Sequence, residues 1–251
     1  MNSLIDRGFA EGALRGVAIA LLAVPLGGCV LDRVLETHRQ LCDVRPPQVV
    51  VAPSGHGFRV DFDRPTLTKD DILWLVGLPP TRIVDTPGGL RLVYTAAPLD
   101  RALTRNATLS TELVLRDAGG VPRLAATVPP ERVASLVPRE IVDAVIATIC
   151  HPEISFAPPG ARFDLAQVPG AAYPDEARIV AQLGPPHFRD GTNFGYRFCL
   201  EPCDPTARPI ATFVYATGDD GSLRRATLAY FRYQLDIDRA ARTATLALRL
   251  P

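Results

Sequence analysis

The chain is patterned in two ways, with apolar residues either at every second position or at every third and fourth position. The stretch 58–62, Phe-Arg-Val-Asp-Phe, alternates strictly, which predicts a half-buried strand. Residues 210–249 alternate in the same way between turn signals and predict an antiparallel meander. Apolar residues at helical spacing predict helices over about 30–42 and about 138–150.

Two shorter helices are bounded by local signals. Thr68 is a predicted N-cap, with Asp71 at the third helical position, where an acid can close a capping box. This helix should end at Gly77, because glycine and the prolines that follow it stop helices. A matching helix is predicted to open at Pro174 and to end at Gly184.

The chain also repeats itself. Three pairs of segments share residue patterns: LCDVRPPQVVVAPSGHGFRVDFD (41–63) with ICHPEISFAPPGARFDLA (149–166), DDILWLVGLPPTRIVD (70–85) with EARIVAQLGPPHFRD (176–190), and RDAGGVPRLAAT (116–127) with GDDGSLRRAT (218–227). Corresponding features keep the same order and lie between 101 and 108 positions apart. A constant order at a nearly constant separation indicates an internal duplication.

From these elements we predict an α+β fold made of two tandem repeats. Each repeat is expected to contain an antiparallel sheet packed with about two helices. The predicted boundaries are 29–129 for the first repeat and 130–251 for the second. Apolar residues make up 47% of the 251 residues, enough for a packed core and against wholesale disorder.

An apolar run near the start of the chain concerns location rather than fold. Val17–Leu26 is too short for a membrane-spanning helix, which needs roughly 20 apolar residues, but has the length of a signal-peptide core. It leads into Leu26-Gly27-Gly28-Cys29, which resembles the lipoprotein box of bacteria. The resemblance implies that 1–28 is a lipoprotein signal peptide and that Cys29 is the lipidation site, carrying palmitate and other acyl chains.

The same resemblance implies a location in the cell envelope. The residue after Cys29 is Val30 and not the aspartate that retains enterobacterial lipoproteins at the inner membrane. The expected location is therefore the outer membrane, with the protein anchored by lipid and facing the periplasm. The alternative is an ordinary signal peptide that is cut elsewhere, in which case Cys29 has no special role.

Four further cysteines bear on covalent structure: Cys42, Cys150, Cys199 and Cys203. An even number in an oxidising compartment predicts two disulfides, for which three pairings exist. Cys42 and Cys150 occupy equivalent positions in the repeat, so a bridge between them is favoured, which leaves Cys199 and Cys203 to close a tight turn. Four reduced, buried thiols are the alternative.

No arrangement of residues predicts catalysis. Ser54-Gly55-His56-Gly57 lacks the pattern of a nucleophile elbow, and Cys150 and His151 are adjacent in sequence, where side chains do not face each other. The four cysteines lack zinc-knuckle spacing, so neither a metal nor a cofactor is expected. The only tryptophan, Trp74, is expected in the core because its helical neighbours are apolar.

The charge of the chain bears on which class of macromolecule it binds. The formal net charge is zero and no basic patch stands out, so nucleic acid is not an expected partner. The sequence leaves the oligomeric state open.

Residues 68–94 resemble the SmpA/OmlA (BamE-like) small outer-membrane lipoproteins, which have a Thr-capped short helix, a Leu-Gly-x-Pro turn and strands with aromatic residues. Residues 173–196 repeat the pattern. Two departures are clear, because the family usually has one unit and places two adjacent helices before its sheet. A tandem arrangement of such units also resembles the fold of the β-lactamase-inhibitor protein.

These resemblances imply binding of proteins rather than catalysis. We therefore predict a non-enzymatic, lipid-anchored envelope protein that binds another envelope protein and supports outer-membrane assembly or integrity. The alternative prediction is a periplasmic inhibitor or small-ligand-binding module that uses the cleft between the two repeats.

Overall fold

The computed structural model describes most of the chain from residue 49 onwards and a few positions before it. The described residues are 33, 36–37, 39, 49–55, 57–99, 108–137, 141–142, 153–156, 159–166, 168, 173–204, 206 and 209–248.

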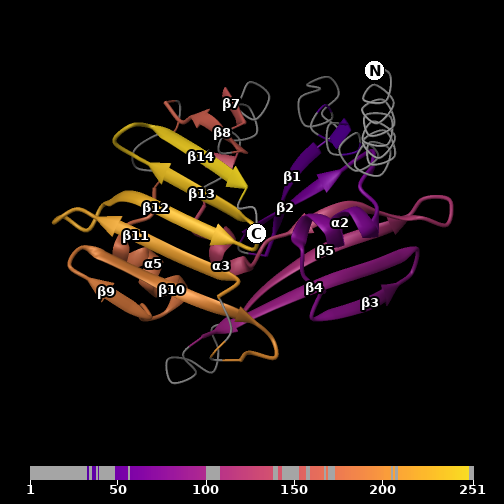
Figure 1. Ribbon diagram of the computed structural model, residues 1–251, viewed down its shortest axis with the longest axis horizontal. Coiled ribbons are helices and arrows are strands. Elements are labelled where there is room, and N and C mark those ends of the chain that lie inside the picture. Colours follow the sequence, from indigo (N-terminus) through magenta and orange to yellow (C-terminus); the bar gives the residue numbers. More distant parts are fainter. Residues whose placement is uncertain are drawn as a thin grey trace, which may run out of the picture.

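Antiparallel strands make up most of the described chain (Figure 1). The first half contains β1 (Val49–Ser54), β2 (Gly57–Phe62), β3 (Arg82–Thr86), β4 (Gly89–Pro98), β5 (Leu109–Asp117) and β6 (Pro122–Val128). The second half contains β7 (Glu153–Phe156), β8 (Pro159–Asp164), β9 (Phe188–Asp190), β10 (Asn193–Leu200), β11 (Ala211–Thr217), β12 (Leu223–Tyr230), β13 (Tyr233–Asp238) and β14 (Thr243–Leu248). Three described helices accompany them: α2 (Lys69–Val76), α3 (Glu131–Ala134) and α5 (Glu176–Leu183).

All fourteen of these strands belong to one sheet. Its order is β1-β2-β6-β5-β4-β10-β11-β12-β13-β14-β8-β7, with β3 pairing with β4 and β9 with β10. Each half has a hairpin, an eight-residue helix, a second hairpin and then a meander, and the last strand of each meander returns to the first hairpin. The halves lie side by side in Figure 1 and join where β4 pairs with β10.

The two short helices form for the reasons that the sequence provides. The Thr68 hydroxyl accepts a hydrogen bond from the amide of Asp71, and the Asp71 carboxylate accepts one from the amide of Thr68, which confirms the capping box. Gly77 ends α2 with a φ of 72°, a left-handed conformation that favours glycine. The matching helix α5 is capped by Asp175 rather than opened by Pro174, and it ends at Gly184 as predicted.

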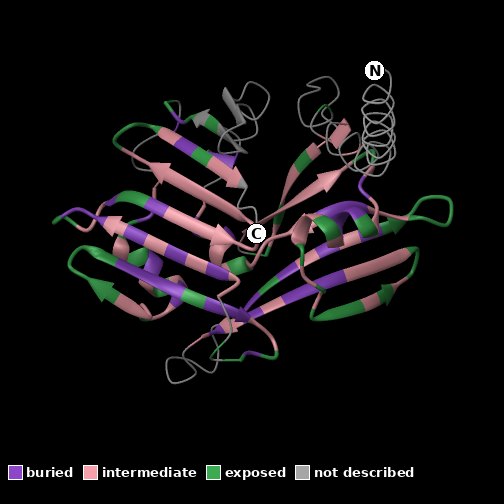
Figure 2. Cartoon of the chain, in the orientation of Figure 1, coloured by how far each residue is buried: buried purple, intermediate pink, exposed green. Residues whose placement is uncertain are grey.

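The buried side chains of the two halves interlock. The largest core cluster lies over β10–β12 in the second half but includes Ala96 and Leu109 of the first half. A second cluster lies between α2 and the strands β4–β6, and Leu200 and Phe231 of the second half pack against it. Figure 2 shows buried positions along β4, β10 and β11, on both sides of the place where the halves meet.

The predicted fold class is wrong. We expected an α+β protein with about two helices and a separate sheet in each repeat, but the described chain is mainly antiparallel strand joined into one continuous sheet. The helices α2 and α5 are only eight residues long, and α3 only four, so they cover little of that sheet. The meander over 210–249 is confirmed as β11–β14.

The two longer predicted helices fall largely outside the described residues. Within 30–42, the positions 33, 36–37 and 39 are helical, and within 138–150 the positions 141–142 are helical and buried. The predicted boundary between the repeats, at 129–130, falls between the end of β6 and the start of α3.

Candidate functional site

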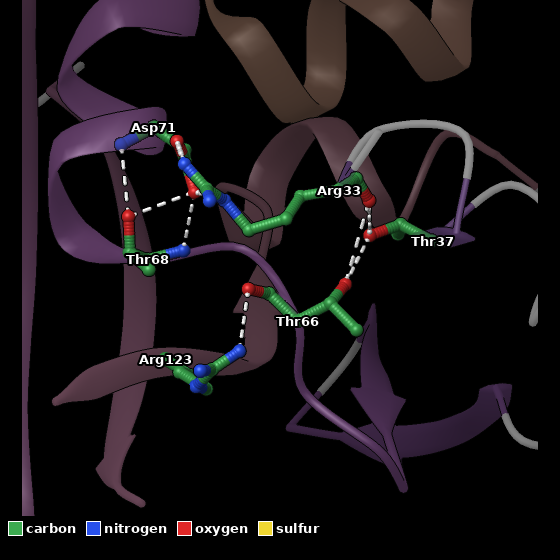
Figure 3. A network of polar contacts seen from close by, with 6 residues as sticks. All are labelled: Arg33, Thr37, Thr66, Thr68, Asp71 and Arg123. Atoms are coloured by element: carbon green, nitrogen blue, oxygen red, sulfur yellow. Dashed lines mark hydrogen bonds and ion pairs between the residues drawn. The ribbon is translucent and has the colours of Figure 1, made fainter. Parts of the chain in front are cut away.

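The first notable site is an ion pair between a half-buried arginine and a buried carboxylate at the start of α2 (Figure 3). Asp71 is 1% exposed, and its carboxylate accepts hydrogen bonds from Nε and Nη2 of Arg33, at 2.5 and 2.6 Å. The amide and hydroxyl of Thr68 donate to the same carboxylate, at 2.8 and 2.7 Å. Burial alone would raise the pKa of Asp71, but the hydrogen bonds from Arg33 and Thr68 outweigh it and hold the pKa below its ordinary value.

Neighbouring threonines extend this network to the loop before α2. The hydroxyls of Thr37 and Thr66 lie 2.7 Å apart, and the Thr37 hydroxyl donates to the carbonyl of Arg33 at 2.8 Å. The guanidinium of Arg123, on β6, donates to the carbonyl of Thr66 at 3.1 Å. Figure 3 shows how these groups converge. Arg33 and Thr37 are thereby bound to the folded first half at several points.

The sequence assigned Asp71 only to the start of a helix and did not predict Arg33 as its partner. The two residues are 38 positions apart, and no local pattern links them. An acid three residues after a capping threonine is explained by the cap alone, so its long-range contact with Arg33 leaves no signal in the sequence.

The second site is the junction between the halves. Pro98 of β4 pairs with Phe198 of β10, Ala97 with Cys199, and Ala96 with Leu200. One hydrogen bond flanks these pairs on each side. The amide of Leu99 donates to the carbonyl of Arg197 at 2.9 Å, and the amide of Glu201 donates to the carbonyl of Thr95 at 3.0 Å.

These two flanking hydrogen bonds are related by the internal repeat. Positions 95 and 197 are 102 apart, as are 99 and 201, and so are the directly paired 97 and 199. A local pseudo-twofold axis therefore passes through the pair of Ala97 and Cys199, and equivalent strands of the two halves form the junction.

Polar contacts beside the junction follow the same relation. Tyr94 donates its hydroxyl proton to the carbonyl of Leu78 at 3.3 Å, and Tyr196 donates to that of Gly184 at 2.8 Å. Each carbonyl belongs to the residue before a Pro-Pro pair. Burial raises the pKa of Tyr94 and of Tyr196 from 10.0 to about 12, so both hydroxyls are donors at neutral pH.

The residues that follow the two Pro-Pro pairs are also equivalent. The amide of Thr95 donates to the Thr81 hydroxyl at 3.0 Å, and the amide of Arg197 donates to Nδ1 of His187 at 3.0 Å. The His187 ring also packs against Tyr196 at 5.4 Å between centroids. The sequence did not single out Thr81 or His187, although their place after Pro-Pro was visible in the repeat.

A hollow opens at the junction. Its volume is about 460 Å³, and it is lined by Thr81, Ala97, Pro98, Glu201, Pro202 and Cys203, so both halves contribute. Cys203 lies at disulfide distance from Cys199, with 5.4 Å between their Cα atoms, which closes the 199–203 turn against the hollow. The lining combines the apolar surface of Ala97, Pro98 and Pro202 with the polar groups of Thr81 and Glu201.

Several predicted site residues lie outside the described residues: Cys29, Cys42, Cys150, His56 and His151. Among the described residues, no three His, Cys, Asp or Glu side chains gather as a metal site requires. Within the same part of the chain, no helix combines the length and the apolar character needed to cross a bilayer.

The placement of Trp74 in the core is wrong. Its side chain is 60% exposed, whereas Ile72 on the same helix is buried. The apolar run 72–76 does not show which face of α2 meets the sheet, because every position in it is apolar.

Comparison of the chain with protein-family models, with curated proteins and with solved structures gave no match in any of the three. The resemblance of residues 68–94 to a lipoprotein family therefore stays a prediction, and the function is argued from the geometry of the two sites.

Proposed function

We propose that this protein is a non-enzymatic lipoprotein of the bacterial envelope, anchored through Cys29 to the outer membrane and facing the periplasm. It binds another envelope protein and supports outer-membrane assembly or integrity. The observation that carries the proposal is the contact of Arg33 with buried Asp71, four residues after the predicted lipidation site.

This contact bears on where the signal peptide ends. A cut after residue 33 would remove Arg33 and leave the carboxylate of Asp71 buried without its charged partner, which is strongly unfavourable. A cut before Cys29 keeps Arg33 and the whole network of Thr37 and Thr66. The geometry therefore favours a mature chain that begins upstream of Arg33, as the lipoprotein box requires.

The anchor has a direct test. Labelled palmitate should enter the wild-type protein, and the mature chain should begin at Cys29 with the mass of its acyl chains. Cys29→Ala should abolish the label, whereas Cys199→Ala should not. A mature chain without acyl mass, or one that begins elsewhere, would contradict the anchor.

The binding site that we propose for the partner is the hollow at the junction. It is formed by both halves, and its lining combines the apolar side chains of Ala97, Pro98 and Pro202 with the polar groups of Thr81 and Glu201, which matches the mixed character of protein-binding surfaces. A photo-crosslinking residue at Thr81 or at Glu201, introduced in intact cells, should capture a component of the β-barrel assembly machinery. Ala118 and Asp219, exposed in turns outside the hollow, are matched control positions.

A second function is favoured by the size of the same hollow. A volume of about 460 Å³ falls within the range of roughly 300–1,000 Å³ that holds small ligands. If the crosslinker captures no protein from the hollow but a small molecule leaves with the purified protein, the ligand-binding alternative replaces partner binding. Equal capture from the hollow and from the control positions would contradict both.

A further inference from the structure

Trp74 is the most exposed of the large apolar side chains in the described chain. Its exposed fraction is 60%, against 46% for Val50, 48% for Ile83 and 42% for Val121. Tryptophan is among the side chains that gain most from burial, so leaving more than half of it in water forgoes stabilisation. Trp74 lies on the outward face of α2 together with exposed Asp70 and Gly77.

The anchor brings this face close to the membrane. Arg33 is fixed on Asp71, which precedes Trp74 by three residues, or about 4.5 Å along the helix axis. Cys29 precedes Arg33 by four residues, which span at most about 14 Å when fully extended. The acyl chains of Cys29 are therefore joined to α2 by a short tether and one arginine side chain.

We propose that α2 rests on the lipid bilayer that holds the acyl chains of Cys29, and that Trp74 enters its interfacial layer as a second contact. This rests on the proposed function, because it requires the lipid anchor. The occupant of the exposed face is a lipid surface, where the amphipathic ring of tryptophan is favoured at the level of the headgroups.

The charges beside Trp74 define the kind of lipid contact. Exposed Asp70 lies on the same face of α2 as Trp74, Lys69 precedes Asp70, and the guanidinium of Arg232 lies against Gly77. These described charges leave an excess of one positive charge, which adds only about 1 kcal/mol of attraction to anionic lipid. The contact is therefore mainly hydrophobic. It should form on zwitterionic vesicles and persist when the salt concentration is raised.

The test uses the only tryptophan as its own reporter. Full-length mature protein is purified from membranes, its acyl mass is checked, and it is placed in vesicles of phosphatidylethanolamine and phosphatidylcholine. We expect the emission of Trp74 to shift to shorter wavelength, acrylamide to quench it less than in the Cys29→Ala protein, and lipids brominated near the headgroup end of the acyl chain to quench it.

Two outcomes overturn the inference, and they are distinguishable. An acylated protein on vesicles whose tryptophan emits as in water, unaffected by brominated lipid, contradicts the contact but leaves the anchor intact. A protein without acyl mass contradicts the proposed function and the inference with it.

A variant tests the role of the tether. Arg33→Gln removes the charged contact to Asp71 but keeps the chain length and Cys29. The acylated variant should stay on the vesicles, whereas quenching by brominated lipid should fall because α2 is no longer held next to the anchor. Unchanged quenching in a folded variant would contradict the orienting role of Arg33 and, with it, the geometric basis of the proposal.

Discussion

At the scale of single residues, Asp71 serves a helix and a distant segment at the same time. Its carboxylate closes the capping box with Thr68 and also receives the fork of the Arg33 guanidinium. Planar, two-point contacts of this kind fix direction as well as distance. Arg33, four residues after the predicted anchor, is therefore oriented by one buried acid.

Asp71→Asn is expected to lower the free energy of unfolding by about 2–3 kcal/mol, because it leaves Arg33 without its counter-charge and weakens the cap. The adjacent Asp70 lies in the same first turn but is exposed, so Asp70→Asn is a matched control with an expected loss below about 1 kcal/mol. Urea denaturation of both variants measures the difference. Equal losses would show that Asp71 acts only through the charge of the helix terminus.

The pH dependence of this site has a defined sign. The folded state holds the pKa of Asp71 below its ordinary value of 3.8, so the folded state binds the proton less readily than the unfolded chain. The contribution of Asp71 to stability is complete above that value and is lost as the pH falls through the folded pKa. The stability difference between wild type and Asp71→Asn should therefore be constant near neutrality and shrink below about pH 4.

At the scale of elements, equivalent parts of the two halves can be compared directly. Tyr196→Phe should lower the free energy of unfolding by about 1 kcal/mol, and Tyr94→Phe by less, because the hydrogen bond to Leu78 is longer, at 3.3 Å against 2.8 Å. Because the folded state raises the pKa of both tyrosines, their contribution to the free energy of unfolding is complete below pH 10 and is lost as the pH rises towards 12. The double variant should lose less stability across that range in denaturation at alkaline pH.

The turn between β12 and β13 shows how packing outweighs backbone conformation. Phe231 and Arg242 are described non-glycine residues with a positive φ, 53° in each case. The ring of Phe231 lies edge-on to Tyr94, at 5.4 Å, and packs on the core of the first half, whereas Arg242 is exposed. The left-handed conformation costs about 1–2 kcal/mol at either position, and only Phe231 gains a buried contact.

This contrast gives a matched pair of variants. Phe231→Gly should lower the free energy of unfolding by about 1–2 kcal/mol, because the lost packing exceeds the relief of the backbone. Arg242→Gly should leave it unchanged or raise it by up to about 1 kcal/mol. Thermal or urea denaturation checks both, and a stabilised Phe231→Gly would refute the packing argument.

The elements that could be predicted from the sequence are those with local causes. Thr68, Gly77 and Gly184 mark helix ends through their own backbone and hydrogen bonds, and the alternation of β11 follows from its one buried face. The pairing of β4 with β10 has no such cause, since an edge strand looks the same whether or not another strand adds to it. The exposure of Trp74 was equally invisible in a run of apolar residues.

At the scale of the whole molecule, the two repeats form one folding unit rather than two separate domains. Equivalent strands pair at the pseudo-twofold axis, and each half buries side chains of the other. Separating the halves would expose Ala96 and Leu109 of the first and Leu200 and Phe231 of the second, and it would leave unpaired the edges at 96–98 of β4 and 198–200 of β10.

Residues 29–129 and residues 130–251, produced separately, should therefore each lack the cooperative unfolding of the whole chain. Mixing them should restore it in part, because the exposed edges and core residues are complementary. Near-ultraviolet circular dichroism and urea denaturation of each half and of the mixture measure this. A half that unfolds cooperatively by itself would show that its own core suffices, and the junction would then be an interface between two domains. If the prediction holds, the hollow beside the axis exists only in the joined molecule, and a partner that binds it recognises the assembled pair of repeats.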